Sequence, residues 1–200
     1  MSSSSTAPAT DFLASVGWPV RTERLLLRRA TPEDTSATWE VRRQPSVGQW
    51  ITSAPATFEE YAVYAAQPGW ADRTLVVELD GRVVGDLMLS VEDSWAQTEI
   101  RERAVACQAN LGWCLHPDVQ GRGLATEAVG GLLRICFEEL ALRRVTADCF
   151  AANEASWRLM ERLGMRREAH TVRDSLHRSG AWLDGYSYAL LAEEYRANGH

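Results

Sequence analysis

The run Gln120-Gly121-Arg122-Gly123-Leu124-Ala125 has the residue types of an anion-binding turn. It follows an apolar run, Leu111 to Leu115, typical of a strand, and it opens an apolar-periodic segment, Thr126 to Leu140, typical of a helix. Glycine lets the backbone approach a ligand closely, and a helix start offers unpaired N–H groups at the positive end of its dipole. The sequence therefore predicts a phosphate or pyrophosphate site at this turn.

Two further segments can share a cleft with this turn. If the strands diverge there, the backbone of Trp113 to Leu115 is exposed to an extended ligand. Asn153 and Ser156 begin the helix that follows the strand 144–150, so they emerge at the carboxyl end of the sheet, where α/β proteins bind ligands. Taken singly, each has a plainer interpretation: Asn153 caps its helix, and Ser156 and Glu127 are ordinary first-turn helix residues.

The residue types exclude several other phosphate-binding classes. All 21 cationic residues are arginine, which excludes a P-loop and Schiff-base chemistry because both need lysine. A dinucleotide motif needs glycine where Thr126 stands. The net charge of −6 argues against nucleic-acid binding. Cys114 and His116 share a strand face, but two ligands do not make a zinc site, so we expect no metal.

The bulk composition fits a single folded domain in the cytoplasm. The chain has 200 residues, 46% of them hydrophobic, which suits one domain with its own core. The four cysteines form no CxxC pair and lie in apolar stretches, so we expect reduced, buried thiols. No run approaches the ~18 apolar residues of a membrane span. We expect a disordered tail over residues 1–20, without the features of a signal peptide, and one domain over residues 21–200.

The expected elements alternate in the manner of a mixed α/β domain. Asp80-Gly81 predicts a hairpin turn, and Gly164 predicts a helix end. Strands are expected at 23–29, 73–79, 82–91, 107–115, 144–150, 165–177 and 181–190, and helices at 31–43, 57–67, 123–140 and 153–163. The strands on either side of the long helix should be parallel. Segments 45–55 and 92–106 are expected to be irregular.

The stretch from Leu111 to Gly164 resembles the GCN5-related N-acetyltransferases (GNAT), in particular the RimJ/RimL-like branch that acetylates ribosomal-protein N-termini. The motifs that carry the resemblance are LGWCLHP at Leu111, QGRGLATEA at Gln120, FEEL at Phe137, NEASWRLMERLGM at Asn153 and REAH at Arg167. With RTERLLLRRATPED and WLDGYSYALLAEEY, it covers residues 21–196. The resemblance implies a mixed, mostly antiparallel sheet of six to seven strands with a central, splayed parallel pair, flanked by about four helices.

The resemblance also implies a reaction. An acetyl group would pass directly from acetyl-CoA to a primary amine, either a small molecule or a protein N-terminus. Dimers are common in this branch, so a homodimer is one option. No metal, nucleic acid or membrane takes part.

Particular residues inherit roles from the resemblance. The glycine turn would hold the pyrophosphate, with Arg122 either adding charge or facing water, and the strand before it would pair with the pantetheine arm, which Asn153 would also bind. Many relatives use a tyrosine of this helix at the departing thiolate, but this helix has none. Ser156 matches the serine of the N-terminal branch, which implies that it donates a hydrogen bond to the thiolate. The residues implied for the donor are Trp113, Cys114, Leu115, Gln120, Gly121, Arg122, Gly123, Leu124, Ala125, Thr126 and Asn153, and the catalytic residue is Ser156.

The sequence departs from the family pattern at the general base. Relatives often carry glutamate where this chain has Asn110, which cannot take a proton in this way. Substitutes are sought among Asp86, Glu99, Glu102, Asp174 and His177. A base is dispensable for an α-amine, whose pKa lies below that of lysine.

Two alternative functions stay open: a transferase with a larger acyl donor such as succinyl-CoA, and a non-catalytic acyl-CoA sensor. Walls of the acceptor site are expected from Trp50, Trp95 and Trp182.

Overall fold

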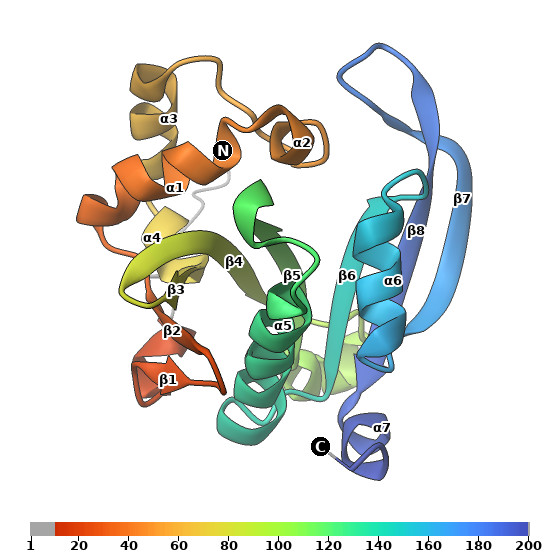
Figure 1. The fold of residues 1–200 in the computed structure, drawn as a ribbon. Helices are drawn as coiled ribbons and strands as arrows, with labels where there is room; N and C mark the ends of the chain where they lie inside the picture. The colour runs from red at the N-terminus through yellow and green to blue at the C-terminus, as the bar shows by residue number, and fades with distance from the viewer. Residues whose placement is uncertain (1–10, 200) are drawn as a thin grey trace, which may run out of the picture.

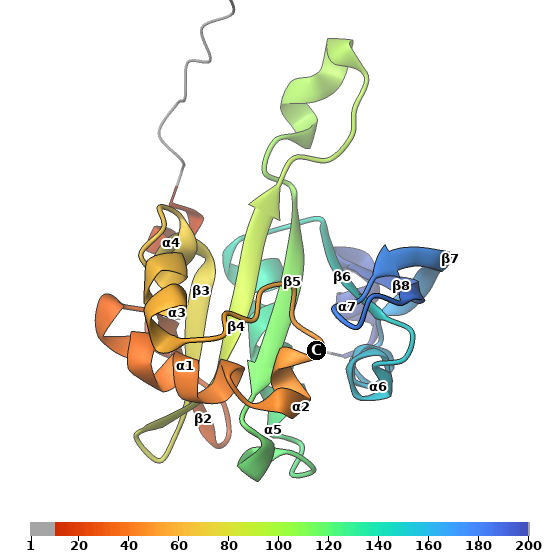
Figure 2. The same ribbon diagram turned by 90° about the horizontal axis from the view of Figure 1, so that it is seen from above.

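The central strands bury apolar side chains on both faces, so the sheet has helices on both sides (Figures 1 and 2). The computed structural model describes residues 11–199. In β3 (Thr74–Leu79), Leu75 and Val77 face the main core under the long helix α5, whereas Val76 between them packs against Trp70 on the other side. This alternation follows from the two-residue period of a strand and explains the three-layered build.

The sheet has eight strands in the order β1-β2-β3-β4-β5-β6-β8-β7. Every neighbouring pair is antiparallel except β5 with β6, which confirms the predicted class of sheet. Besides β3, the strands are β1 Val20–Arg21, β2 Leu25–Arg29, β4 Arg82–Glu92, β5 Gln108–Leu115, β6 Arg144–Phe150, β7 Arg166–Leu176 and β8 Trp182–Leu191. The eighth strand, beyond the six to seven expected, is the two-residue edge strand β1.

The helices form two groups around this sheet. The first group, α1 to α4, gathers beside β3 and β4. The second group contains α5 and α6, which lie beside β5 and β6 (Figure 1). The bounds are α1 Thr35–Arg42, α2 Pro45–Gly48, α3 Phe58–Ala65, α4 Trp70–Arg73, α5 Leu124–Arg134, α6 Glu154–Arg162 and α7 Ala192–Ala197. A π-helical turn, Ile135–Glu139, continues α5, so the predicted helix 123–140 is present with one wider turn at its end.

Several boundaries differ from those predicted. Residues 1–10 of the expected tail lie outside the described residues, but Leu13 and Val16 are buried in the main core, so the folded part begins before residue 21. The segments expected to be irregular each contain a short helix: α2 in one, and a 3-10 helix, Thr98–Ala104, in the other. The helices α4 and α7 were not predicted because four and six residues are too few to show a periodicity.

Candidate active site

The parallel strands β5 and β6 separate along their length. They pair only where Gln108–Asn110 meets Arg144–Thr146, and both strands continue beyond that pairing, to Leu115 and to Phe150. Backbone N–H and C=O groups on the facing edge of β5 therefore lack a strand partner over residues 111–115. An unpaired strand edge can accept the hydrogen-bonding groups of an extended ligand.

The glycine turn has the left-handed backbone that its residue types predict. Gly121 and Gly123 have φ angles of 72° and 77°, and Gly123 is the N-cap of α5. The first N–H groups of α5 have no intrahelical acceptor and point out of the helix start. Two hydrogen bonds brace the turn: Gln120 Nε2 donates to Leu115 O at 3.3 Å, and Arg24 Nη1 donates to Arg122 O at 3.0 Å. The turn is thus a rigid set of backbone donors.

Glu127, in the first turn of α5, anchors the chain that precedes β2. It accepts hydrogen bonds from Thr22 Oγ1 at 2.5 Å, Arg24 N at 2.7 Å and Arg24 Nε at 2.7 Å. Burial opposes ionisation of this carboxyl, but the hydrogen bonds from Thr22 and Arg24 outweigh it and lower the pKa of Glu127. The first-turn acid therefore does more than complement the helix dipole.

Glu127→Gln should destabilise the fold in a pH-dependent way. The pKa of Glu127 is lower in the folded chain than its usual value of 4.5, so its contribution is full above pH 4.5 and disappears as pH falls through the folded pKa. We expect a loss of about 1.5–3 kcal/mol at pH 7, the usual value of hydrogen bonds to a charged group, and a smaller loss below pH 4.5. Urea unfolding at both pH values measures it; an equal loss at both would contradict this role.

Asn153 and Ser156 lie together at the start of α6. Asn153 is the N-cap, and its Oδ1 accepts a hydrogen bond of 3.4 Å from Ser156 N, so the plainer interpretation of Asn153 holds as well. Burial raises the pKa of the neighbouring Cys149 to about 11, an effect that a hydrogen bond with the Ser156 side chain partly offsets. The Ser156 side chain thus lies next to the Cys149 sulfur.

Two adjoining hollows occupy the space between the separated strands. The larger hollow, about 680 Å³, extends from the glycine turn to Ser156, and the smaller hollow, about 390 Å³, adjoins it and is lined by residues of β4, β5 and β6. They share six lining residues: Trp50, Ile51, Trp113, Cys114, Asn153 and Ser156. Every residue that the sequence implied for the donor lines the larger hollow except Arg122, whose side chain is exposed. A ligand in one hollow would therefore meet a ligand in the other beside Ser156.

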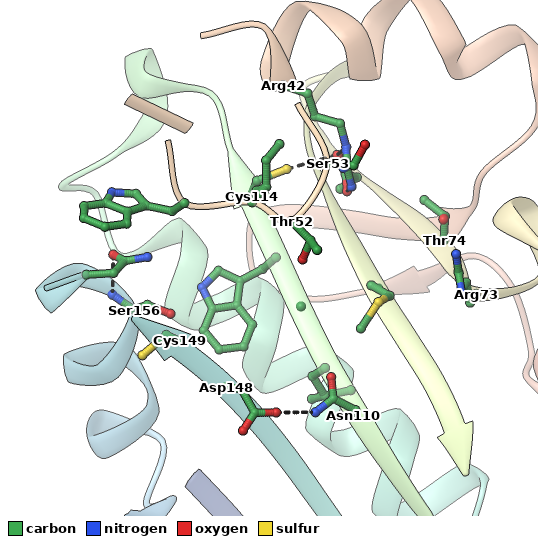
Figure 3. A pocket seen from close by; sticks show the side chains of 18 of the residues that line it. Arg42, Thr52, Ser53, Arg73, Thr74, Asn110, Cys114, Asp148, Cys149 and Ser156 are labelled. Atoms are coloured by element: carbon green, nitrogen blue, oxygen red, sulfur yellow. Dashed lines mark hydrogen bonds and ion pairs between the residues drawn. The ribbon is translucent and has the colours of Figure 1, made fainter. Parts of the chain in front are cut away.

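The smaller hollow has two acidic residues in its lining, Asp86 and Asp148 (Figure 3). Asp86 is buried, with 2% of its side chain exposed, and both its oxygens receive hydrogen bonds from Arg42, at 2.9 and 2.5 Å. Asp148 is exposed to the hollow. Asn110 Nδ2 donates to Asp148 Oδ2 at 2.9 Å, so the residue that replaces the family's glutamate contacts a carboxylate on the next strand.

The other proposed bases lie outside both hollows. Glu99 and Glu102 belong to the 3-10 helix on the segment that projects beyond β4 and β5 in Figure 2. Asp174 is exposed on β7. The ring of His177 is held between Gln49 O and Ser179 Oγ, each at 2.9 Å, and joins the last hairpin to the segment after α2. Of the five, the structure thus brings only Asp86 to the site, and its carboxylate is already paired.

The lining also differs from the expected walls. Trp50 lines both hollows, whereas Trp95 and Trp182 are 89% and 57% exposed and line neither. Sequence reasoning missed Asp148, Arg73 and Arg162, which line the hollows. The alternation along β6 places Asp148 on the same face as Thr146, but only the register between β5 and β6 brings it to Asn110.

Residues 11–199 contain neither a metal-binding cluster nor a membrane-spanning helix. No group of three His, Cys, Asp or Glu side chains there could hold a metal ion, and the four cysteines are free thiols. No helix in this range has the length and apolar character needed to cross a membrane.

Comparison with known proteins identifies the family. Residues 24–166 match the family model described as Acetyltransferase (GNAT) domain. The Bacillus subtilis N-acetyltransferase YnaD is 38% identical over 85 residues, which are 42% of this chain and about half (49%) of that protein. "Putative ribosomal N-acetyltransferase YdaF" of Bacillus subtilis is 27% identical over 183 residues, covering 86% of this chain and 94% of that protein.

Solved structures share the fold of this chain. The structure of Mycobacterium smegmatis RimJ, solved in complex with CoA-disulfide, superposes with a TM-score of 0.68 at 22% identity, covering 91% of this chain and 96% of that one. The family match spans the glycine turn, the separated strands and the start of α6, which are the elements that build the two hollows. The chain therefore belongs to the GNAT family of N-acetyltransferases, the family predicted from the run Leu111 to Gly164.

Proposed function

We propose that this protein transfers an acetyl group from acetyl-CoA to a primary amine, with the donor in the larger hollow and the acceptor in the smaller one. The observation that carries the proposal is the meeting of the two hollows beside Ser156, with an anion-binding turn at the far end of the larger one. That arrangement suits a long donor whose phosphates and reactive thioester lie far apart. The same position beside Ser156 is open to an amine from the other side.

The donor is held mainly by the backbone. The N–H groups of the glycine turn and of the first turn of α5 bind the pyrophosphate. The unpaired edge of β5 at Trp113 to Leu115 pairs with the amides of the pantetheine arm, and the Asn153 amide, left with donors after capping α6, binds the same arm. Arg162, the last residue of α6, lines the larger hollow and supplies a positive charge for a phosphate group. Mycobacterium smegmatis RimJ, a protein of the same fold, was solved in complex with CoA-disulfide, which supports a CoA thioester as the donor.

The reaction is a direct attack of a neutral amine on the thioester carbonyl. Backbone N–H groups of β5 polarise that carbonyl, and the carbon–sulfur bond then breaks. The Ser156 hydroxyl donates a hydrogen bond to the departing thiolate. The same side chain interacts with the Cys149 sulfur and limits the rise in the pKa of that thiol. A hydroxyl is a weak acid, so Ser156 stabilises the thiolate and relays a proton to it rather than acting as a strong acid.

The acceptor is a protein N-terminus or a small amine. An α-amine fits because a larger share of it is neutral at pH 7 than of a lysine side chain. The name of YdaF points to ribosomal proteins as acceptors. The resemblance to the RimJ/RimL-like branch is our reason to propose also a cytoplasmic location and a homodimer. The smaller hollow is lined by the Arg42–Asp86 ion pair and by two further charged residues, Arg73 and Asp148, which suits a polar acceptor.

The release of free CoA thiol from acetyl-CoA tests this proposal. The protein is incubated with acetyl-CoA and five amines: two peptides, beginning with alanine and with serine, spermidine, benzylamine and L-phenylalanine. We expect one free thiol for each acetylated amine, the products being identified by mass spectrometry. Acetyl-CoA binding in calorimetry without thiol release on any amine would contradict catalysis and favour the sensor. Faster turnover with succinyl-CoA would instead assign the larger donor.

A further inference from the structure

We propose that Asp148 is the residue that takes the proton from the attacking amine, an assignment that rests on the proposed function. Its carboxylate lies in the smaller hollow, on the strand that leads to Ser156 (Figure 3). The position is next to Cys149, whose thiol hydrogen-bonds the Ser156 side chain. Asp148 and Ser156 both line the smaller hollow, and Ser156 also lies at its junction with the larger one, where amine and thioester must meet.

Elimination within the smaller hollow leads to the same residue. Its lining contains two carboxylates, Asp86 and Asp148, and no histidine. Both oxygens of Asp86 are bound by the Arg42 guanidinium, and Cys114 Sγ is 3.1 Å from Asp86 Oδ2, so that carboxylate is occupied on every side. Among the described residues, no arginine or histidine forms an ion pair with Asp148. Asp148 is therefore the carboxylate of this hollow that remains open to a cationic or polar acceptor.

Two hydrogen bonds fix the orientation of the Asp148 carboxylate and leave acceptor positions free on both of its oxygens. Asn110 Nδ2 donates to Oδ2 at 2.9 Å, and Ser187 Oγ donates to Oδ1 at 2.6 Å. The two donors come from β5 and β8, the strands on either side of β6, so the carboxylate is held from both directions. A carboxylate oxygen has two lone pairs, and each oxygen here uses one of them. One acceptor site on each oxygen remains for the substrate.

The proton balance is simple. The lone pair of the neutral amine forms the carbon–nitrogen bond, and the nitrogen of the resulting adduct becomes positive and strongly acidic. Asp148 takes one proton from that nitrogen while the carbon–sulfur bond breaks and its electron pair leaves with the CoA sulfur. The thiolate is protonated through Ser156, and Asp148 returns its proton to water. The products are the N-acetylated amine and free CoA.

Asp148 also has a structural role, which the experiment must separate from the chemical one. The Asn110–Asp148 hydrogen bond lies beside the last backbone pairing between β5 and β6, so it links the strands where they begin to diverge. Asp148→Asn keeps this link, because its carbonyl oxygen can accept from Asn110 and its amide can donate to Ser187. It removes the ability to take a proton. A second variant, Asn110→Asp with Asp148→Asn, moves the carboxylate to the facing strand.

The test uses the full-length protein, acetyl-CoA and the fastest of the five amines. Removing a general base costs about 10²–10⁴-fold. We expect Asp148→Asn to lower kcat/KM by about 100-fold, with acetyl-CoA affinity and melting temperature close to those of the unaltered protein. The double variant should recover at least about ten-fold of that loss, which a purely structural role would not allow. Asp80→Asn, in the exposed β3–β4 turn, removes the same charge away from the hollow and should be as active as the unaltered protein.

The outcomes separate the two proposals. Active unaltered protein with a loss of less than about ten-fold in Asp148→Asn would overturn the assignment of Asp148 and leave the acetyltransferase proposal standing. A loss in Asp148→Asn that the double variant does not recover at all would also overturn it, because the carboxylate itself would not be what matters. Failure of the unaltered protein to acetylate any of the five amines would overturn both.

Discussion

Asp86→Asn is expected to lower the free energy of unfolding by about 3–5 kcal/mol, the usual cost of removing one partner of a buried ion pair. Asp86 and Arg42 are the most buried oppositely charged pair at the site, with 2% and 13% of their side chains exposed. Burial alone would lower the pKa of Arg42, but the charge of Asp86 raises it well above its ordinary value. Arginine is not deprotonated in proteins, so Arg42 stays charged without its partner, and an unpaired buried charge is costly.

Guanidinium chloride or urea unfolding, with a matched surface pair, measures this effect. Glu154 and Arg158 form an ion pair one turn apart on α6, with more than half of each side chain exposed. Glu154→Gln should cost no more than about 0.5 kcal/mol, because water solvates the arginine that remains. Arg42→Met with Asp86→Leu should recover most of the loss from Asp86→Asn, since no unpaired charge remains. Equal losses for Asp86→Asn and Glu154→Gln would show that burial does not govern this pair.

Ser156→Ala is expected to lower kcat by about ten-fold or more, because one hydrogen bond made to the departing thiolate is lost. The interaction forms as charge develops on sulfur, so it contributes to the transition state and little to donor binding. The acetyl-CoA dissociation constant should therefore change by less than about two-fold. Stopped assays of thiol release and calorimetry give the two numbers. An unchanged kcat would remove Ser156 from the reaction.

A control variant and a measurement on Cys149 further test the role of Ser156. Ser36→Ala, on the exposed side of α1, replaces a serine outside both hollows and should leave kcat unchanged. The pKa of Cys149, about 11 in the free protein, should rise in Ser156→Ala because the hydrogen bond that partly offsets burial is gone. Slower alkylation of Cys149 at alkaline pH would report that change. Slower alkylation of Cys149 with an unchanged kcat for acetyl transfer would mean that Ser156 contacts Cys149 but takes no part in the transfer reaction.

The sequence was enough to predict the local backbone of the glycine turn and of the start of α6. Gly121 and Gly123 stand where the backbone needs positive φ, and Asn153 stands where a helix needs a cap. Such features depend on neighbours a few residues away, so their residue types predict them. The parallel pair was predictable for a similar reason, because a strand, a long helix and a second strand in succession favour one crossover geometry.

The acceptor side could not be predicted in this way. Asn110 and Asp148 are 38 residues apart, and the hydrogen bond between them depends on the register of β5 against β6. A shift of one residue in that register would turn Asp148 to the opposite face of the sheet. The pairing of Asp86 with Arg42 likewise joins residues 44 apart. Composition and spacing could name these residues as candidates, but only the packing decides which carboxylate is free.

The short contact between β5 and β6 has a mechanical consequence. Three residue pairs join the half-sheet β1–β5 to the half-sheet β6, β8 and β7, so the seam between the halves has few backbone bonds to resist bending. A donor lying along β5 and touching α6 would bridge the two half-sheets and restrict their relative movement while it is bound. By mass action its binding would raise the resistance of the whole sheet to unfolding. Product release would then restore the looser hinge, so each turnover would alternately stiffen and relax the two halves.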